Sequence, residues 1–292
     1  MPIIQEVQFR TVDGLTLHGN LYPAEERGPA VVLTPGFACV KEMFVPDVAE
    51  AFQAANITAL TYDPRNTGAS EGEPRQDIDP LAQASDYSDA LTFLSQQPTV
   101  DPNQISFWGF SFAGMVSLTA AALDRRARQV IAVCPLTDFG FSGKREKVLA
   151  KITKDRESQV AGNVPFCVPV LTSKGENPAG FGGNPEAEDY GKILNAHQVA
   201  PSYKNSTTLQ TYYKIARWQP FGLVKSVAPT PALIVTSADD RISTAKNQGK
   251  LVDSIDGPKK WHVEPNKGHM DILSGESFPK LMKLQVDFLK GA

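Results

Sequence analysis

The stretch Ile105–Gly114, ISFWGFSFAG, decides how this chain folds. A short apolar run of β-forming residues enters a turn of small residues that has a serine at its apex. Gly109 and Ala113 flank the serine, where the incoming strand and the outgoing helix must nearly touch; alanine takes the place of the usual second glycine, and Gly114 follows it. The pattern predicts a nucleophile elbow, a strained turn that lifts Ser111 clear of a sheet.

Composition is that of an ordinary globular protein. The chain has 292 residues, 41% of them hydrophobic, and a net charge of −3. This length suits one large α/β domain with insertions. The balanced charge and the lack of a dense Lys/Arg run predict neither nucleic acid nor a membrane surface as a partner. The amino terminus lacks the pattern of a secretory leader, and no apolar run is long enough for a bilayer, so we expect a cytoplasmic protein.

Three widely spaced cysteines, Cys39, Cys134 and Cys167, are expected to be reduced and to act as small hydrophobic residues. Their spacing favours neither a disulfide framework nor a metal site, and we expect no metal and no other cofactor.

The order of predicted elements indicates the fold class. Val7–Tyr22 alternates apolar and polar residues around Asp13-Gly14, which predicts an antiparallel hairpin. After it, short β-rich runs alternate with helical segments, for example a helix that starts at Asp79-Pro80. Such alternation predicts a mostly parallel eight-stranded sheet with helices on both faces. The six further strands are expected at Ala30–Leu33, Ile57–Tyr62, Ile105–Trp108, Val130–Val133, Ala232–Thr236 and Lys260–Val263.

A long insertion is predicted after the sixth strand. The segment between Cys134 and Pro231 far exceeds the few residues that most connections need. It starts with a charged helical pattern, continues with many Pro and Gly residues and ends with aromatic residues. We interpret it as a mainly helical cap over the carboxyl edge of the sheet. The predicted division is 1–138 for the first part of the core, 139–225 for the cap and 226–292 for the second part of the core.

A serine hydroxyl is a weak nucleophile and needs a base within hydrogen-bond reach. Two of the four histidines, His18 and His262, lie inside strand patterns, and His197 lies in the insertion. His269 remains, in a loop that follows the last predicted strand. We therefore expect His269 to be the base for Ser111.

The base in turn needs an orienting carboxylate. The run that ends the preceding strand supplies two adjacent candidates, Asp239 and Asp240, of which only one can point inward. Either choice gives the chain order serine, aspartate, histidine.

An acyl reaction also needs hydrogen-bond donors for the developing oxyanion. The expected donors are the backbone amides of Phe112, next to the serine, and of Phe37, in the loop after the third strand. Aromatic residues near an elbow either pack or line a pocket, and we expect an apolar acyl pocket here. Its predicted lining is Phe37, Phe112, Met115, Phe139, Tyr212, Tyr213 and Trp218.

With these elements in order, the chain resembles the α/β-hydrolase superfamily from about Gln5 to its end. The resemblance favours Asp240 as the acid, because a small residue, Ser237, stands three places before it. Some relatives place the acid after the sixth strand, which makes Asp138 an alternative. In such hydrolases the segment Asp63–Ser70 braces loops through its arginine rather than binding phosphate.

A narrower resemblance is carried by Pro35–Phe44, Asp86–Leu94 and Ala132–Leu136, which are similar to the fungal polyketide transferase family. Members of that family accompany polyketide biosynthetic enzymes and are associated with moving or releasing polyketide chains, or with steps after release. The resemblance implies a serine hydrolase or acyltransferase that forms an acyl-enzyme. Its partner would be a small-molecule acyl substrate, a polyketide-derived thioester or ester, either free or bound to a carrier protein.

Two other functions stay open at this point. The same pocket could cyclise or condense a released polyketide with His269 as base and without an acyl-enzyme. A non-catalytic binding protein on the same scaffold is disfavoured because serine, aspartate and histidine are all present. The sequence leaves the oligomeric state open.

Overall fold

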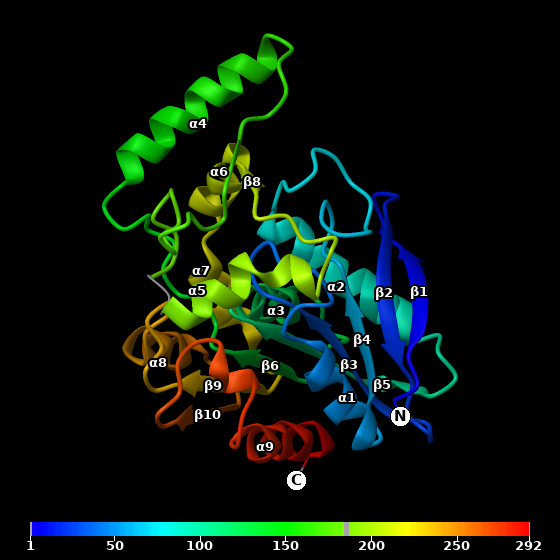
Figure 1. Cartoon of the computed structure of the whole chain (residues 1–292). Coiled ribbons are helices and arrows are strands. Elements are labelled where there is room, and N and C mark those ends of the chain that lie inside the picture. Colours follow the sequence, from blue (N-terminus) through cyan, green and yellow to red (C-terminus); the bar gives the residue numbers. More distant parts are fainter. Residues whose placement is uncertain (1, 184–186, 292) are drawn as a thin grey trace.

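An eight-stranded sheet runs through the protein, whose computed structural model describes residues 2–183 and 187–291 (Figure 1). The strand order is β1-β2-β4-β3-β5-β6-β9-β10. β2 is antiparallel to β1 and to β4, and the remaining neighbours are parallel. The predicted fold class is therefore confirmed. The strands are β1 (Gln5–Arg10), β2 (Thr16–Tyr22), β3 (Gly28–Thr34), β4 (Thr58–Tyr62), β5 (Val100–Phe110), β6 (Val130–Val133), β9 (Ala232–Ser237) and β10 (Lys259–Glu264).

The central strands are buried along their length because helices cover both faces of the sheet. Every residue of β4, β6 and β9 is buried. β6 has the predicted bounds, whereas β5 begins at Val100 rather than at Ile105. The additional strand residues 101–104 are exposed or half-buried, and they form no apolar run from which the sequence could predict a strand.

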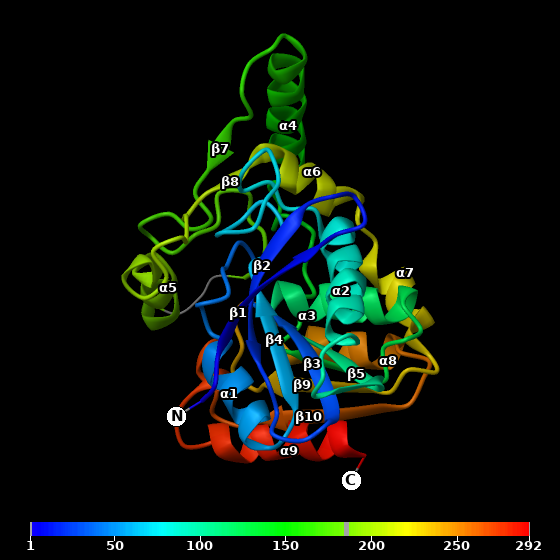
Figure 2. The same cartoon turned by 90° about the vertical axis from the view of Figure 1, so that its right-hand side faces the viewer.

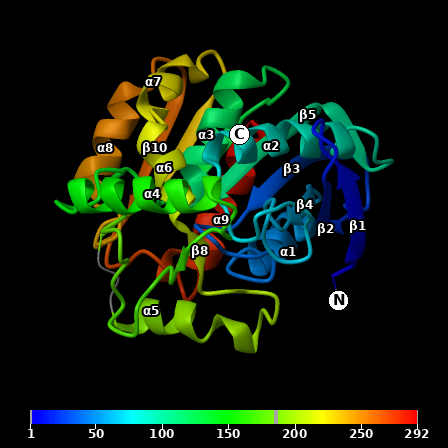
Figure 3. The same ribbon diagram turned by 90° about the horizontal axis from the view of Figure 1, so that it is seen from above.

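Helices lie on both faces of the sheet, as Figure 3 shows from above. α1 (Pro46–Ala54) and α9 (Phe278–Lys290) cover one face. The opposite face carries α2 (Pro80–Leu94), α3 (Phe112–Leu123), α7 (Pro220–Val224) and α8 (Ala245–Ser254). α2 begins where predicted, since the Asp79 carboxylate accepts hydrogen bonds from the amides of Leu81 and Ala82.

The segment between β6 and β9 leaves the sheet. α4 projects from the body of the molecule, and α5 and α6 lie between it and the sheet (Figures 1 and 2). Two short strands pair in antiparallel fashion, a small sheet that the sequence did not predict. α7 packs against α3, in the helical layer of the core, although the predicted cap range 139–225 includes it. The elements are α4 (Arg145–Val160), β7 (Cys167–Val168), α5 (Ala187–Leu194), η1 (Ala196–Gln198), β8 (Thr207–Thr208), α6 (Leu209–Arg217), α7 and η2 (Lys225–Val227).

The base of this segment is fastened to the loop that precedes α2. The Thr208 amide donates to Gln76 O at 3.1 Å, and the Ile78 amide donates to Thr211 Oγ1 at 2.8 Å. Lys214 forms an ion pair with Asp77. The start of α6 is thus held to the core by polar contacts.

Arg65, in the loop after β4, contacts both the first hairpin turn and helix α2. Its guanidinium donates to both carboxylate oxygens of Asp86 and, at 2.7 Å, to Asp13 Oδ2. Hydrogen bonds from Arg65 and then from Thr11 lower the pKa of Asp13 from 3.8 to about 2. The arginine joins the first hairpin turn to α2, which agrees with the expected bracing role.

The three cysteines are unpaired. Cys39 and Cys134 are buried as expected, whereas Cys167 is exposed, so the expectation of a buried small hydrophobic residue is wrong there. No helix within residues 2–183 and 187–291 is both long enough and apolar enough to cross a membrane.

Candidate active site

Ser111 stands in a strained turn between β5 and α3, with φ 57° and ψ −120°. Non-glycine residues seldom adopt positive φ, so the surrounding packing must impose it. A Cβ atom on Gly109 would lie 2.0 Å from the carbonyl oxygen of Ala113, which is far inside contact distance. Only glycine allows the strand and the helix to approach so closely. The predicted elbow is present at the carboxyl end of the central strand.

The three predicted residues meet in one hydrogen-bonded chain. His269 Nε2 lies 2.8 Å from Ser111 Oγ, and His269 Nδ1 lies 2.7 Å from Asp240 Oδ2. Ser111, Asp240 and His269 are all buried. β9 leads to the aspartate and β10 leads to the histidine, so the parallel sheet brings them to the edge where Ser111 lies. A neutral imidazole that donates to the carboxylate can accept the serine proton.

Backbone amides hold the carboxylate of Asp240 in place. Its Oδ1 accepts hydrogen bonds from the amides of Ile242 at 2.8 Å and Ser243 at 2.7 Å. The side chain of Gln248 donates to Oδ2 at 3.1 Å. Sequence reasoning missed Gln248, because a glutamine in a surface-type helix carries no signal of its own.

The two other carboxylates considered from the sequence lie elsewhere. Asp239 is exposed. Asp138 accepts a hydrogen bond from the Gly140 amide in its own loop. Among the three carboxylates, Asp240 is the one that contacts the imidazole of His269.

The loop after β3 packs against the elbow. A Cβ atom on Gly36 would lie 3.4 Å from Ser111 Cβ, so the neighbouring Phe37 backbone is beside the serine. Phe112 is the first residue of α3, where backbone amides have no acceptor within the helix. Within the described residues neither the Phe37 amide nor the Phe112 amide donates to a protein acceptor. Both amides are therefore available for a developing negative charge beside Ser111.

A cavity of about 80 Å³ adjoins Ser111 and His269. Of the predicted pocket residues, Phe37 lines it. The other walls come from the core and from the insertion, and sequence reasoning missed them. They include Phe44, Phe110, Leu136, Val170, Leu171, Asn177, Phe181, Ile193, Ile242 and Met270. Several of them stand in the Pro- and Gly-rich tract, which has no periodicity that would show which residues point inward.

Most of the remaining predicted pocket residues form a second layer behind this cavity. The Phe112 ring lies 5.6 Å from the Trp218 ring, and Trp218 lies 5.1 Å from Phe139. Tyr212 packs 6.3 Å from Phe181, which does line the cavity. Met115 is fully buried in α3.

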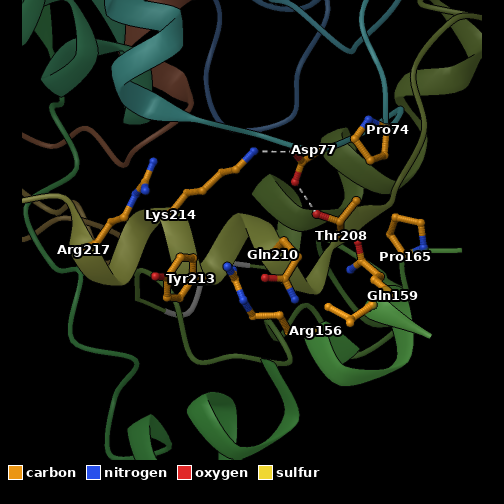
Figure 4. Close-up of a pocket in the computed structure, with 11 residues that line it drawn as sticks. Pro74, Asp77, Arg156, Gln159, Pro165, Thr208, Gln210, Tyr213, Lys214 and Arg217 are labelled. Carbon is orange, nitrogen blue, oxygen red and sulfur yellow. Dashed lines mark hydrogen bonds and ion pairs between the residues drawn. The ribbon is translucent and has the colours of Figure 1, made fainter. Parts of the chain in front are cut away.

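Tyr213 lies apart from the cavity. It is 37% exposed, and the guanidinium groups of Arg156 and Arg217 lie 5.3 and 5.8 Å from its ring centre. Figure 4 shows these side chains around a separate surface pocket. The reason is the helical period of α6, which turns Tyr212 inward and its neighbour outward. We therefore leave Tyr213 out of the proposed acyl site.

One group of metal-ligand type is present beside the serine. Ligand atoms of Cys134, Asp240 and His269 lie within 4.8 Å of one another. The histidine and the aspartate already bind each other, and Cys134 Sγ is 3.2 Å from Ser237 Oγ. Burial raises the pKa of the Cys134 thiol well above its usual value, which disfavours the thiolate that a metal needs. The three side chains therefore do not suit a metal site: Asp240 binds the imidazole of His269, and Cys134 stays a buried thiol.

The chain is similar to known proteins over nearly its whole length. The model of the alpha/beta hydrolase family matches residues 31–279. A thiohydrolase of Eupenicillium brefeldianum is 53% identical over 291 residues, which cover 98% of this chain and 94% of that protein. A polyketide transferase of Stachybotrys chlorohalonatus (strain IBT 40285) is 46% identical over 290 residues, covering 98% and 96%. The crystal structure of the α/β hydrolase GrgF from Penicillium sp. sh18 superposes with a TM-score of 0.89 at 37% identity, covering 99% and 98% of the two chains.

Proposed function

This chain belongs to the α/β-hydrolase family, and on that premise we propose that it is a serine thiohydrolase or acyltransferase of polyketide biosynthesis. Its full-length relatives are named thiohydrolase and polyketide transferase, which supports an acyl thioester as substrate. The acyl chain is polyketide-derived, and it leaves the enzyme as an acid or as an ester.

The buried chain Ser111–His269–Asp240 is the observation that carries this proposal. Ser111 Oγ attacks the thioester carbonyl carbon while its proton moves to His269 Nε2. Asp240 keeps the imidazole in the required tautomer and stabilises the imidazolium that forms. The amides of Phe37 and Phe112 donate to the oxyanion of the tetrahedral intermediate.

The intermediate collapses with cleavage of the carbon–sulfur bond. The departing thiolate takes the proton from His269, and the acyl group stays on Ser111 as an ester. A water molecule or an acceptor alcohol then gives its proton to His269 and attacks this ester. The acid or the new ester is released, and Ser111 regains its proton.

Trapping of the acyl-enzyme tests this function. The octanoyl thioester of N-acetylcysteamine is mixed with the enzyme, free thiol is followed by stopped flow, and quenched samples are analysed by mass spectrometry. We expect a burst of thiol and an octanoyl group on Ser111. A Ser111→Ala variant that releases thiol at the native rate would disprove the proposed mechanism.

A further inference from the structure

A row of lysines marks the projecting helix α4. Lys144 stands at the N-cap position, and Lys147, Lys151 and Lys154 follow at intervals of three and four residues. Such spacing puts side chains on one side of a helix. All four residues are exposed. In the part of the chain that the structure describes, none of the four forms an ion pair.

The lysines border an apolar groove of about 510 Å³. Its other wall is the segment after α4, where Val164 is 85% exposed and Phe166 is 61% exposed. The Phe166 amide donates to the buried Asp155 carboxylate at 2.8 Å, which ties this wall to α4. An exposed apolar groove rimmed by polar or charged side chains marks an interaction surface.

The inner end of the groove reaches the wall of the catalytic cavity. Tyr212 and Ala179 line the groove, whereas Asn177 and Phe181 line the cavity beside Ser111. Asn177 Nδ2 donates to the Tyr212 hydroxyl at 2.9 Å. A hydrogen-bonded pair of side chains therefore links the wall of the groove to the wall of the catalytic cavity.

We propose that this lysine groove, formed by Lys144, Lys147, Lys151, Lys154 and the wall of Val164 and Phe166, docks an acidic carrier domain. The carrier presents the acyl chain as a thioester on its phosphopantetheine arm, so the proposal rests on the thioesterase function given above. The acidic surface of the carrier faces the lysines, and the arm enters along the apolar wall toward Tyr212. Opposite charge steers the encounter and fixes the orientation of the carrier.

Charge favours this occupant over a second copy of the chain. The protein as a whole carries −3, yet this helix presents four cations without acidic partners. Arg156, which packs on Tyr213 in Figure 4, extends the cationic surface to the other side of α4. Two copies docked through the same groove would bring two lysine rows together, which costs free energy.

The test compares two thioesters of the same acyl group, one on a carrier protein and one on a small thiol. The octanoyl group is presented on the phosphopantetheine of a purified acidic acyl carrier protein and, separately, as the small neutral N-acetylcysteamine thioester. The variant Lys147→Glu/Lys151→Glu/Lys154→Glu is compared with Lys225→Glu/Lys246→Glu/Lys290→Glu. The control changes net charge equally, at exposed lysines of η2, α8 and α9.

We expect the α4 variant to lose at least about tenfold in kcat/KM with the carrier protein and to change less than about twofold with the small thioester. The control should keep both activities. Added salt should slow the native enzyme with the carrier protein but not the α4 variant.

Equal losses on both substrates, or a native enzyme that does not prefer the carrier, would overturn the docking site while leaving the thioesterase function intact. Native self-association in sedimentation that the α4 variant abolishes would assign the groove to a second copy instead. A native enzyme inactive on both thioesters would instead contradict the proposed function.

Discussion

Gln248 donates a hydrogen bond of 3.1 Å to Oδ2 of Asp240, the same oxygen that lies 2.7 Å from His269 Nδ1. The glutamine is itself fixed, because its Oε1 accepts from Thr236 Oγ1 at 2.9 Å. This relationship makes Gln248 a positioning residue for the acid.

Gln248→Leu should therefore lower kcat and leave KM nearly unchanged. A hydrogen bond to a charged group contributes about 1.5–3 kcal/mol, which corresponds to roughly tenfold to a hundredfold in rate. The rate of Ser111 labelling by a fluorophosphonate should fall in parallel. Gln285→Leu is the control, since Gln285 is also buried but binds Trp108 Nε1, away from the serine. A similar loss of kcat in both variants would mean that Gln248 acts only through stability.

Asp240→Asn and Asp239→Asn should differ sharply. The first removes the carboxylate that fixes the imidazole tautomer, and kcat should fall on the order of 10⁴-fold. The second changes an exposed side chain and should keep most activity. Thioester hydrolysis by the two purified variants measures the difference. Comparable mild losses would remove Asp240 from the proposed triad.

The size of the cavity gives a prediction about chain length. The cavity beside Ser111 and His269 is small, at about 80 Å³, and the Phe181 ring forms part of its wall. Phe181→Ala should enlarge it and raise the ratio of kcat/KM for decanoyl over acetyl thioesters. Phe139→Ala is the matched control, because its ring lies 6.0 Å from Phe181 and does not line the cavity. An unchanged ratio in Phe181→Ala would place the acyl chain elsewhere.

Gly109→Ala should destabilise the protein by about 3 kcal/mol or more, because the new methyl group would overlap the Ala113 carbonyl. Gly191→Ala is the comparison, since nothing lies within 4 Å of the added Cβ and alanine favours helix α5. Urea unfolding measures both. If Gly109→Ala unfolded at the native urea concentration, the close crossing of β5 and α3 would be wrong.

The low pKa of Asp13 predicts how stability depends on pH. Because the folded value of about 2 lies below the ordinary 3.8, the contribution of this carboxylate is complete above about pH 4. It is lost as the pH falls from about 4 to 2. The stability difference between the native protein and Asp13→Asn should therefore shrink over that interval. A difference independent of pH would show that the Arg65 contact does not depend on the charge of Asp13.

The elbow, the sheet and the histidine could be predicted because local rules govern them. An apolar strand followed by G-x-S-x-A specifies the turn at Ser111, and few histidines compete for the place after the last strand. Tyr213 was misplaced although a signal existed, since Leu209, Tyr212 and Ile215 share one helical face and Tyr213 does not.

The cavity walls could not be predicted in the same way. Several wall residues, Val170, Asn177 and Phe181, belong to a tract of turns. In such a tract Pro and Gly set the backbone angles one residue at a time, so the direction of each side chain follows no repeating pattern. Gln248 reaches Asp240 through a tertiary contact that no local pattern encodes. The turn at Ser111 could therefore be predicted from the sequence, whereas the cavity walls and Gln248 could not.

The hydrogen bonds and the ion pair that hold α6 to the loop before α2 have a consequence for protein engineering. Thr208 and Lys214 of the insertion are bound to Gln76 and Asp77 of the core, two segments far apart in the chain. A chimera that takes only residues 139–225 from a relative would lose these contacts, and Asp77 would face the side chains of the relative. Exchange of the loop 74–79 together with the insertion keeps the contacts as one transferable module. Recombination of substrate preference between such enzymes therefore needs two crossover regions rather than one.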